Sequence, residues 1–228
     1  MAALSLEKVT RIYRKGDSEV RALDGVDLAI EAGEFMAVVG PSGSGKTTLL
    51  NIIGCLDSPT GGKVVYEGQE LHALDEKGLS AYRRDRISFV FQSYNLIPVL
   101  TVRENVSLPL EIERKLDARE IRERADEIIA AVGLSGKETR YPRELSGGQE
   151  QRVAIARALV KRPLVVLADE PTANLDSHTA EEIVELMRKM NADRKTTFVF
   201  STHDRLVMEH ARRIATIRDG IIVSDERK

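Results

Sequence analysis

A glycine-rich string, GPSGSGKT, occupies residues 40–47. It fits the pattern G-x-x-x-x-G-K-[ST], which binds nucleoside triphosphates when a strand precedes it and a helix follows it. The apolar run at 35–39 is long enough for a buried strand, and residues 46–54 carry leucine and isoleucine at helical spacing. A chance glycine-rich turn is the alternative, but it would not need this context on both sides. The string therefore predicts an α/β chain that binds a nucleoside triphosphate.

The side chains and backbone of this loop suit the phosphates of a nucleotide. Glycine lets the backbone aim its N–H groups at phosphate oxygens, and a helix beginning near Lys46 adds the positive end of its dipole. We expect the Lys46 ammonium to contact the β- and γ-phosphates and the Thr47 hydroxyl to bind Mg²⁺. The predicted binding residues are Gly40, Ser42, Gly43, Ser44, Gly45, Lys46, Thr47 and Thr48.

Two carboxylates follow a second apolar run, at residues 164–168. Open α/β sheets bind their ligands at the carboxyl ends of strands, where Asp169 and Glu170 would stand. We expect Asp169 to hold Mg²⁺ through water and Glu170 to act as general base on the attacking water. A lone Asp-Glu pair is more often a solvated turn. Here the surrounding sequence favours a site, because a helix is predicted after residues 174–176, with Ser177 as its cap.

A second glycine-rich string, LSGGQ, lies at residues 145–149 and leads into a helical pattern at 153–159. Its place at a helix N-terminus predicts another anion site. Because the loop at 40–47 already supplies one set of phosphate ligands, this second site makes best sense if it completes the nucleotide of a neighbouring copy. The alternative is a helix-capping turn in which Ser146 is the cap.

Three single residues also follow strand-like stretches. Tyr13 closes such a stretch ahead of the glycine-rich loop, Gln92 follows the apolar run at 87–91, and His203 follows another run beginning at Phe198. A lone histidine is usually structural or merely exposed, and Tyr13 could instead be a core residue. At the end of a third strand in a phosphate-binding protein, however, His203 is expected to sense the γ-phosphate.

Together these motifs, in this order, resemble those of the ATPase subunits of ABC transporters, and the resemblance covers nearly the whole chain. The matching positions are Tyr13 (A-loop), 40–47 (Walker A), Gln92 (Q-loop), 145–149 (signature), Asp169 with Glu170 (Walker B), 174–176 (D-loop) and His203 (switch histidine). The resemblance implies that ATP and Mg²⁺ are the ligands and that Tyr13 stacks on adenine. It implies catalytic roles for Lys46, Glu170 and His203, and Mg²⁺ ligation by Thr47, Gln92 and Asp169.

The resemblance also implies a homodimer in the ATP-bound state, in which the signature turn of one copy caps the nucleotide of the other. The residues implied to act on the neighbour's nucleotide are Ser146, Gly147, Gly148, Gln149 and Asp176. The partners implied beyond this dimer are membrane-spanning permeases on separate chains, with this subunit held at the cytoplasmic face of the inner membrane.

Two further stretches are similar to the lipoprotein-release and macrolide-export branch of the family, namely LDSPTGG at 56–62 and NLIPVLTVRENV at 95–106. Ala173 and Glu150 depart from residues common in that branch. The implied function is the ATP-hydrolysing subunit of such a transporter. Alternatives are a regulatory ABC ATPase of a cell-division complex that transports nothing, and a soluble ABC ATPase of DNA repair or translation. The last class usually carries long coiled-coil insertions or tandem ATPase domains, neither of which occurs in this sequence.

Length and composition agree with one such domain. Of the 228 residues, 1–92 and 162–228 are expected to form the nucleotide-binding core, with antiparallel strands in 1–34, and 93–161 an inserted helical subdomain. A net charge of −2 gives no electrostatic reason to expect nucleic-acid binding. The single cysteine, Cys55, is expected to pack as a small apolar residue. No apolar run approaches the ~20 residues of a membrane span, so we expect the permease to be a separate polypeptide.

The segment 92–100 is unusually apolar for a connection that should run over the surface. Exposed apolar patches often mark protein–protein contacts, so this segment is a candidate docking site for the membrane partner. Alternatively, Leu96, Ile97 and Leu100 simply pin the helical insertion to the core.

Overall fold

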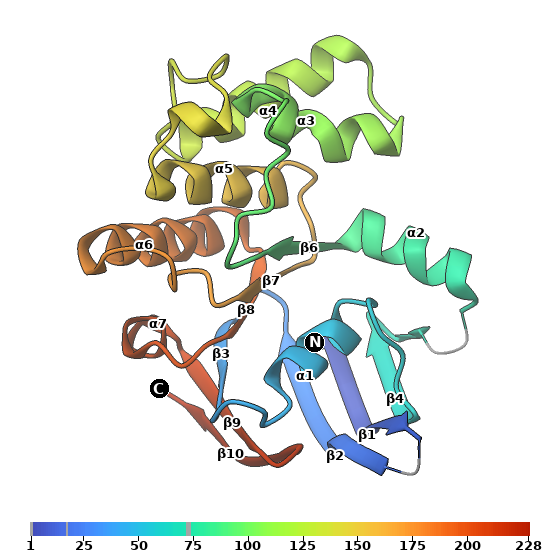
Figure 1. The fold of residues 1–228 in the computed structure, drawn as a ribbon. Coiled ribbons are helices and arrows are strands. Elements are labelled where there is room, and N and C mark those ends of the chain that lie inside the picture. The colour runs from blue at the N-terminus through green and yellow to red at the C-terminus, as the bar shows by residue number, and fades with distance from the viewer. Residues whose placement is uncertain (1, 17, 72–73) are drawn as a thin grey trace.

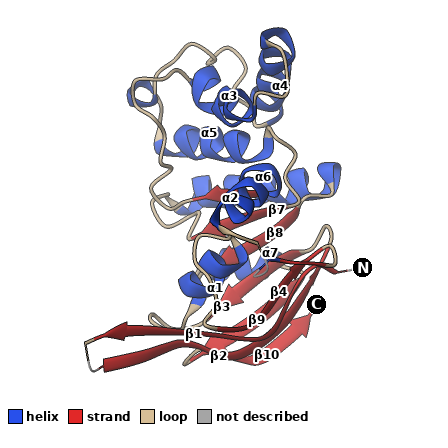
Figure 2. Cartoon of the chain, turned by 90° about the vertical axis from the view of Figure 1, so that its right-hand side faces the viewer, coloured by secondary structure: helices blue, strands red, loops and turns tan. Residues whose placement is uncertain are grey.

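The computed structural model describes residues 2–16, 18–71 and 74–228, and two β-sheets organise them (Figure 1). The first sheet is antiparallel, with strand order β2-β1-β4-β5. Its strands are β1 (Ala2–Lys15), β2 (Ser18–Glu31), β4 (Gly61–Tyr66) and β5 (Gln69–Glu70). Buried residues alternate with exposed ones along the second half of β2, so one face of this sheet lies on the core. The turn end of the long β1–β2 hairpin projects from the body of the molecule (Figure 2).

The second sheet is mostly parallel, as the sequence predicts, with strand order β10-β9-β3-β8-β7-β6. Only β9 and β10 are antiparallel neighbours. The strands are β3 (Phe35–Val39), β6 (Ile87–Val90), β7 (Val165–Asp169), β8 (Thr197–Ser201), β9 (Arg213–Arg218) and β10 (Ile221–Arg227). Strands β3, β7 and β8 are buried on both faces, which explains their continuous apolar runs.

Helices cover both faces of this parallel sheet. They are α1 (Lys46–Ile53), α2 (Glu76–Arg86), α3 (Val102–Glu113), α4 (Ala118–Ala131), α5 (Gly147–Leu159), α6 (Ser177–Arg194) and α7 (Arg205–His210), with a 3₁₀ turn at Pro142–Glu144. Figure 1 shows α3, α4 and α5 as a layer of their own, with α6 between that layer and the sheet. None of the described helices is long and apolar enough to cross a membrane.

The two faces of the parallel sheet bury different side chains, because successive residues of a strand point to opposite sides. Along β3, Phe35 and Ala37 pack in one core cluster with the helical layer and α6. Met36 and Val38 pack in a second cluster with α1 and the antiparallel sheet. Helix α1 therefore lies between the two sheets, and its N-terminus begins where the glycine-rich loop ends.

Several sequence expectations are corrected at this level. The cap of α6 is Asp176, whose side chain accepts a hydrogen bond from the Thr179 N–H, and Ser177 is the first helical residue. The antiparallel sheet extends beyond 1–34, because β4 pairs with β1 and β5 pairs with β4. Helix α2 is not among the sequence expectations; its Leu79 and Tyr82 pack against the second core cluster, while no residue of the helix is fully buried.

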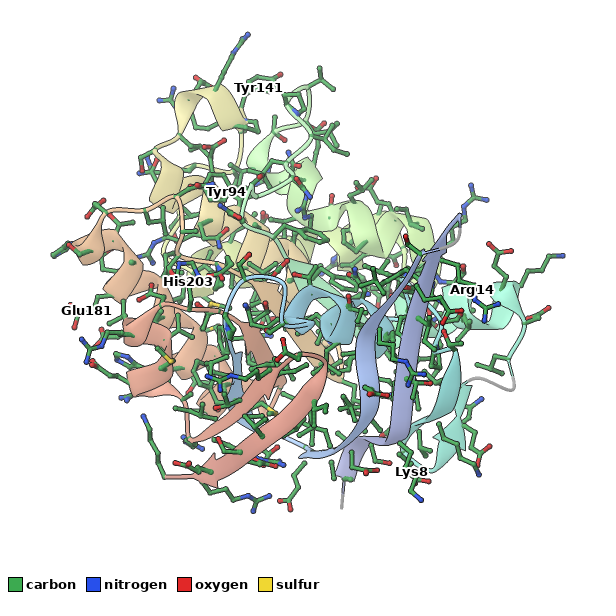
Figure 3. All side chains as sticks on the ribbon, turned by 60° about the horizontal axis from the view of Figure 1, so that its bottom comes forward. Lys8, Arg14, Tyr94, Tyr141, Glu181 and His203 are labelled. Carbon is green, nitrogen blue, oxygen red and sulfur yellow. The ribbon has the colours of Figure 1, made fainter. Side chains whose placement is uncertain are left out.

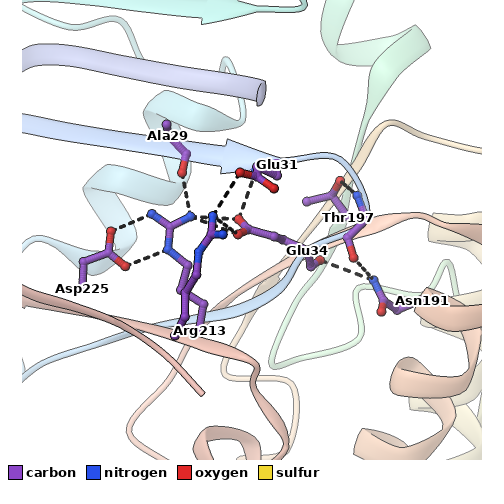
Figure 4. Close-up of polar contacts among 9 residues, drawn as sticks. Ala29, Glu31, Glu34, Asn191, Thr197, Arg213 and Asp225 are labelled. Carbon is purple, nitrogen blue, oxygen red and sulfur yellow. Dashed lines mark hydrogen bonds and ion pairs between the residues drawn. The ribbon is translucent and has the colours of Figure 1, made fainter. Parts of the chain in front are cut away.

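A buried arginine links the C-terminal strands to the rest of the fold (Figure 4). The Arg213 guanidinium binds both oxygens of Asp225 at 2.6 and 2.7 Å, both oxygens of Glu34 at 3.0 and 3.1 Å, and the Ala29 carbonyl at 2.7 Å. This pairing holds the pKa of the Asp225 carboxyl below its usual range. The network joins β9, β10, β2 and the start of β3, so the two sheets meet at a fixed place.

Candidate nucleotide site

The loop at residues 40–47 joins β3 to α1 and lies against the backbone of neighbouring strands. A Cβ atom on Gly40 would lie 2.1 Å from the Ile217 carbonyl oxygen, and one on Gly45 would lie 2.4 Å from the Ala22 carbonyl oxygen. Real Cβ atoms do not approach so closely, and carbonyl groups within strands cannot move aside. Glycine is therefore required at both positions, and the loop is held in shape by β9 and β2.

Donor groups converge inside this loop. The Lys46 ammonium donates to the carbonyl oxygens of Gly40 at 2.7 Å and Pro41 at 3.0 Å, which leaves one of its three N–H groups unused. The hydroxyls of Ser44 and Ser201 are buried and have no hydrogen-bond partner among the described residues. Buried polar groups almost always have partners, so these unpaired hydroxyls fit a site that receives phosphate oxygens.

A single pocket brings most of the predicted residues together. It is lined by the whole of 40–48 and by Gln92, Asp169, Glu170, Ser201 and His203. Three strands deliver these side chains, because β3, β7 and β8 are parallel and end at the same edge of the sheet.

The Glu170 carboxylate is held by two neighbours. Its Oε1 lies 2.7 Å from Nδ1 of His203, and its Oε2 accepts a hydrogen bond of 3.1 Å from the Thr202 hydroxyl. The backbone of Glu170 has φ +45°, a left-handed conformation that a glutamate adopts only at some cost. Its N–H is bonded to the Ser201 carbonyl at 2.9 Å, which fixes this conformation. The glutamate is thus aimed into the pocket, whereas the His203 side chain remains 78% exposed (Figure 3).

Two side-chain amides join the segments around the pocket. Asn174 donates to the Gln92 carbonyl at 2.9 Å, which ties the segment before α6 to the segment after β6. The buried Gln151 of α5 donates to the Pro171 carbonyl at 2.6 Å. Movement of α5 in the helical layer would therefore displace the segment that directly follows the two carboxylates, Asp169 and Glu170.

The signature turn at 145–149 lies outside this pocket. Ser146 caps α5 through a reciprocal pair of bonds, since its hydroxyl accepts from the Gln149 N–H and its own N–H donates to the Gln149 side chain. A Cβ on Gly148 would lie 2.4 Å from Cγ2 of Thr179, so the turn packs tightly on the first turn of α6. Asp176, the cap of α6, is exposed close to the same place. None of these residues is part of the pocket lining.

Tyr13 does not line the pocket either. Its ring lies on the projecting hairpin, its hydroxyl donates to Asp57 at 2.7 Å, and its side chain is 39% exposed, so it is not a core residue. The adenine-stacking role of Tyr13 stays a prediction.

Several residues that line the pocket lie outside the recognised motifs and are not identified from the sequence. Val20, Arg21 and Ala22 of β2 line it, as do Ser201 and Asp219. Gly220 donates its N–H to the Ser44 carbonyl at 3.0 Å. No motif marks these positions, because much of their contribution comes from backbone atoms and strand pairing.

The pocket also suits a magnesium ion shared with a nucleotide. Thr47, Gln92 and Asp169 supply hydroxyl, amide and carboxylate oxygens, the ligand type that Mg²⁺ prefers. Among the described residues no three His, Cys, Asp or Glu side chains are grouped as a metal site. The donor set therefore fits an ion that also takes phosphate and water ligands rather than a closed protein cage.

Comparison with known proteins agrees with this geometry. The family model described as "ABC transporter" matches residues 23–173. The chain belongs to the ABC transporter family. As an ATP-binding cassette of that family it is an ATPase.

Relatives share both sequence and fold. The chain is 48% identical over 222 residues to the macrolide export ATP-binding/permease protein MacB of Hyphomonas neptunium, covering 97% of this chain and 34% of that protein. It thus spans about a third of the length of this larger relative. It is 46% identical over 227 residues to an uncharacterized ABC transporter ATP-binding protein, MJ0796, of Methanocaldococcus jannaschii, covering 98% and 97% of the two chains. A solved dimeric structure of MJ0796 bound to ADP and Pi matches with a TM-score of 0.89 and 45% identity over 98% of each chain.

Proposed function

We propose that two copies of this ABC ATPase close over two ATP molecules and that hydrolysis reopens the pair. The observation that best supports this proposal is that the signature turn at 145–149 does not line the nucleotide pocket of the same chain. Ser146 and Gly148 lie at a capped helix N-terminus, a ready anion site, yet they line no part of the pocket that holds Lys46 and Glu170. Solved dimeric structures of the related MJ0796 cassette support a second copy as the source of the signature turn that would cover each nucleotide.

Within each closed site, this chain's residues divide the chemistry. Glu170 takes a proton from the water that attacks the γ-phosphate, because its carboxylate is aimed into the pocket and held there by His203 and Thr202. The Lys46 ammonium and the backbone N–H groups of the loop stabilise the charge that develops on the phosphate oxygens. The exposed His203 is placed to donate a hydrogen bond to the γ-phosphate. Bound Mg²⁺ supplies further neutralisation of phosphate charge.

The membrane partner would dock at a groove beside the pocket. The groove runs between α2, β6, α3 and α5, and its apolar lining includes Phe89, Phe91 and the exposed Ile112. The candidate segment 92–100 contributes Asn95 to it, whereas Leu96 packs against the core and Val99 is exposed. Because Phe91 directly precedes Gln92, a helix seated in this groove would be coupled to the nucleotide pocket.

Positive charge at the groove indicates an acidic docking helix. Arg83, Arg157 and Lys161 line it and donate to backbone carbonyls, and none forms an ion pair with a carboxylate of the described residues. Burial lowers the pKa of Lys161 to about 8, while the carboxylates of Glu113 and Asp85 act in the opposite direction. The hydroxyl of Ser88, also in the lining, is buried and has no partner among the described residues.

We infer that the transported material is of the macrolide-export or lipoprotein-release kind, because the named relatives include export ATPases and the stretches at 56–62 and 95–106 are similar to that branch. The subunit would then lie at the cytoplasmic face of the inner membrane, bound to permease subunits. This chain spans about a third of the length of the MacB relative, which is named an ATP-binding/permease protein.

The dimer mechanism is tested by replacing Ser146 with aspartate. Asp caps a helix as well as Ser does, so Ser146→Asp should leave the folded protein intact. Its carboxylate would repel the phosphates of a neighbour's ATP, and we expect ATP hydrolysis to fall at least ~10-fold, the loss of an electrostatic contact of about 1.4 kcal/mol. Ser146→Asn is the matched neutral cap and should retain more activity. Equal turnover in both variants would leave only the capping role.

The docking groove is tested at Ile112, whose side chain is 59% exposed and should tolerate a charge. We expect Ile112→Asp to abolish co-purification with a co-expressed permease and to abolish permease-stimulated hydrolysis, while hydrolysis by the isolated subunit is unchanged. Val223→Asp, at an equally exposed apolar residue of β10, is the control. Retained co-purification by the Ile112 variant would place docking elsewhere.

A further inference from the structure

The loop after α1 places a carboxylate against the aromatic side chain proposed to stack on adenine. Asp57 lies four residues beyond Ile53, the last residue of α1. The Tyr13 hydroxyl donates to its Oδ2 at 2.7 Å, and Arg11 binds both oxygens, with Nε 2.9 Å from Oδ2 and Nη2 2.7 Å from Oδ1. The Ser58 N–H donates to Oδ1 at 2.8 Å. Each carboxylate oxygen therefore accepts two hydrogen bonds, and the group is fixed in place.

Arg11 also covers one face of the Tyr13 ring. Its guanidinium carbon lies 4.6 Å from the ring centroid, a cation–π geometry. With 39% of Tyr13 still exposed, part of the ring is free to receive another flat group. The ring is thus held by a hydrogen bond from its hydroxyl to Asp57 and by the cation–π contact of Arg11 on one face.

Strand pairing places this ring at the rim of the nucleotide pocket. Tyr13 pairs directly with Val20 across the β1–β2 hairpin, and directly opposed residues project to the same face of a sheet. Val20 lines the pocket together with the loop at 40–47. A base stacked on Tyr13 would therefore lie beside the phosphate-binding loop and not on the far side of the sheet.

The N-terminus of α1 would consequently lie beside the phosphates of a nucleotide, and the chain that follows its C-terminus would lie beside the base. Its N-terminus begins at Lys46 in the phosphate-binding loop, and the chain leaving its C-terminus carries Asp57. Further backbone contacts hold this departing chain against β1, since the Ile12 N–H donates to the Thr60 hydroxyl at 3.0 Å and the Thr60 N–H donates to the Thr10 carbonyl at 2.8 Å.

We propose that Asp57 and Arg11 are positioning residues that hold the Tyr13 ring for adenine. The proposal rests on the stacking role of Tyr13 and adds a requirement to it. Stacking alone needs only an aromatic face, so Tyr13→Phe would be mild. If Asp57 orients the ring through the phenolic hydroxyl, Tyr13→Phe and Asp57→Asn should each weaken ATP binding. Both variants would do so by removing the same hydrogen bond.

The test compares ATP with inorganic tripolyphosphate, which has no base. In Tyr13→Phe and in Asp57→Asn we expect the Kd for ATP to rise about 5-fold, the loss of one hydrogen bond of typical strength. The double variant should be less than about 2-fold worse than either single variant, because both remove one interaction. Tripolyphosphate should bind all of them as it binds the parent. The KM for ATP should rise with the Kd, whereas kcat at saturating ATP should change less than about 2-fold.

Two further variants make the outcomes distinct. Tyr13→Ala should weaken ATP binding about 10-fold or more, the loss of a base stack. Glu19→Gln breaks the exposed Arg14–Glu19 pair of 2.8 Å on the same hairpin and should change nothing; Figure 3 shows Arg14 on the opposite side of the view from His203. Parental ATP affinity in Tyr13→Ala would overturn stacking itself. A weakened Tyr13→Ala with unaffected Tyr13→Phe and Asp57→Asn would leave stacking in place and overturn the positioning role, as would equal losses for ATP and tripolyphosphate.

Discussion

Glu170→Gln is expected to slow ATP hydrolysis by at least ~10²-fold while leaving ATP binding intact, which is the range for removal of a general base. An amide of the same shape can still accept a hydrogen bond from Thr202 and face His203, so the pocket should keep its geometry. What disappears is the ability to take a proton from water. With hydrolysis blocked, the ATP-bound dimer should accumulate, and size-exclusion chromatography with and without ATP would detect it.

The matched control is Glu226→Gln. Glu226 is an exposed residue of β10, so this substitution removes the same charge far from the proton transfer. Its turnover should equal that of the parent. Near-parental turnover in Glu170→Gln would remove this carboxylate from the role of base. A slow enzyme that stays monomeric with ATP would keep the base but contradict closure of the dimer.

Lys46→Ala should be equally severe, through binding as well as through chemistry. Loss of a charge-assisted contact to phosphate costs about 1.5–3 kcal/mol, which corresponds to roughly 10- to 150-fold in affinity. The structure adds a second cost, because the ammonium also holds the carbonyl groups of Gly40 and Pro41. Isothermal titration with ATP and a steady-state hydrolysis assay at saturating Mg²⁺ would measure both effects.

Lys189→Ala is the control for this variant, since Lys189 is exposed on α6 and forms no ion pair among the described residues. Parental affinity and turnover in Lys46→Ala would refute its phosphate contact. Thr47→Ala should instead lose activity chiefly at low Mg²⁺ and recover part of it as Mg²⁺ is raised.

The sequence predicts those parts of the fold that depend on residues close together in the chain. The strand ends at Asp169 and His203 and the loop at 40–47 each combine an apolar run with a break, and their parallel arrangement follows from that alternation of strands and helices. The error at the start of α6 is of the same local kind, because Asp176 and Ser177 are both good caps and only the backbone decides between them.

The contacts that complete the site could not be predicted, because they join residues remote in sequence. Tyr13 meets Asp57 across 44 positions, and Arg213 meets Glu34 across 179. The pocket closes on backbone carbonyls of Ala22 and Ile217, whose side chains carry no signal of that role. Periodicity also reveals α2 poorly, since its apolar side consists of little more than Leu79 and Tyr82, which are only partly buried against the second core cluster.

The order in which the strands lie has a consequence for synthesis on the ribosome. The glycine-rich loop emerges early, but the surfaces that shape it, at Ile217 and Gly220, are made long after it. Strand β3 itself pairs with β8 and β9, so the nascent chain has no finished sheet beside its loop until those two strands have been made. A nascent chain that does not yet include β9 should therefore be unable to retain ATP. Until then the apolar β3 segment lacks both of the strands that flank it in the finished sheet.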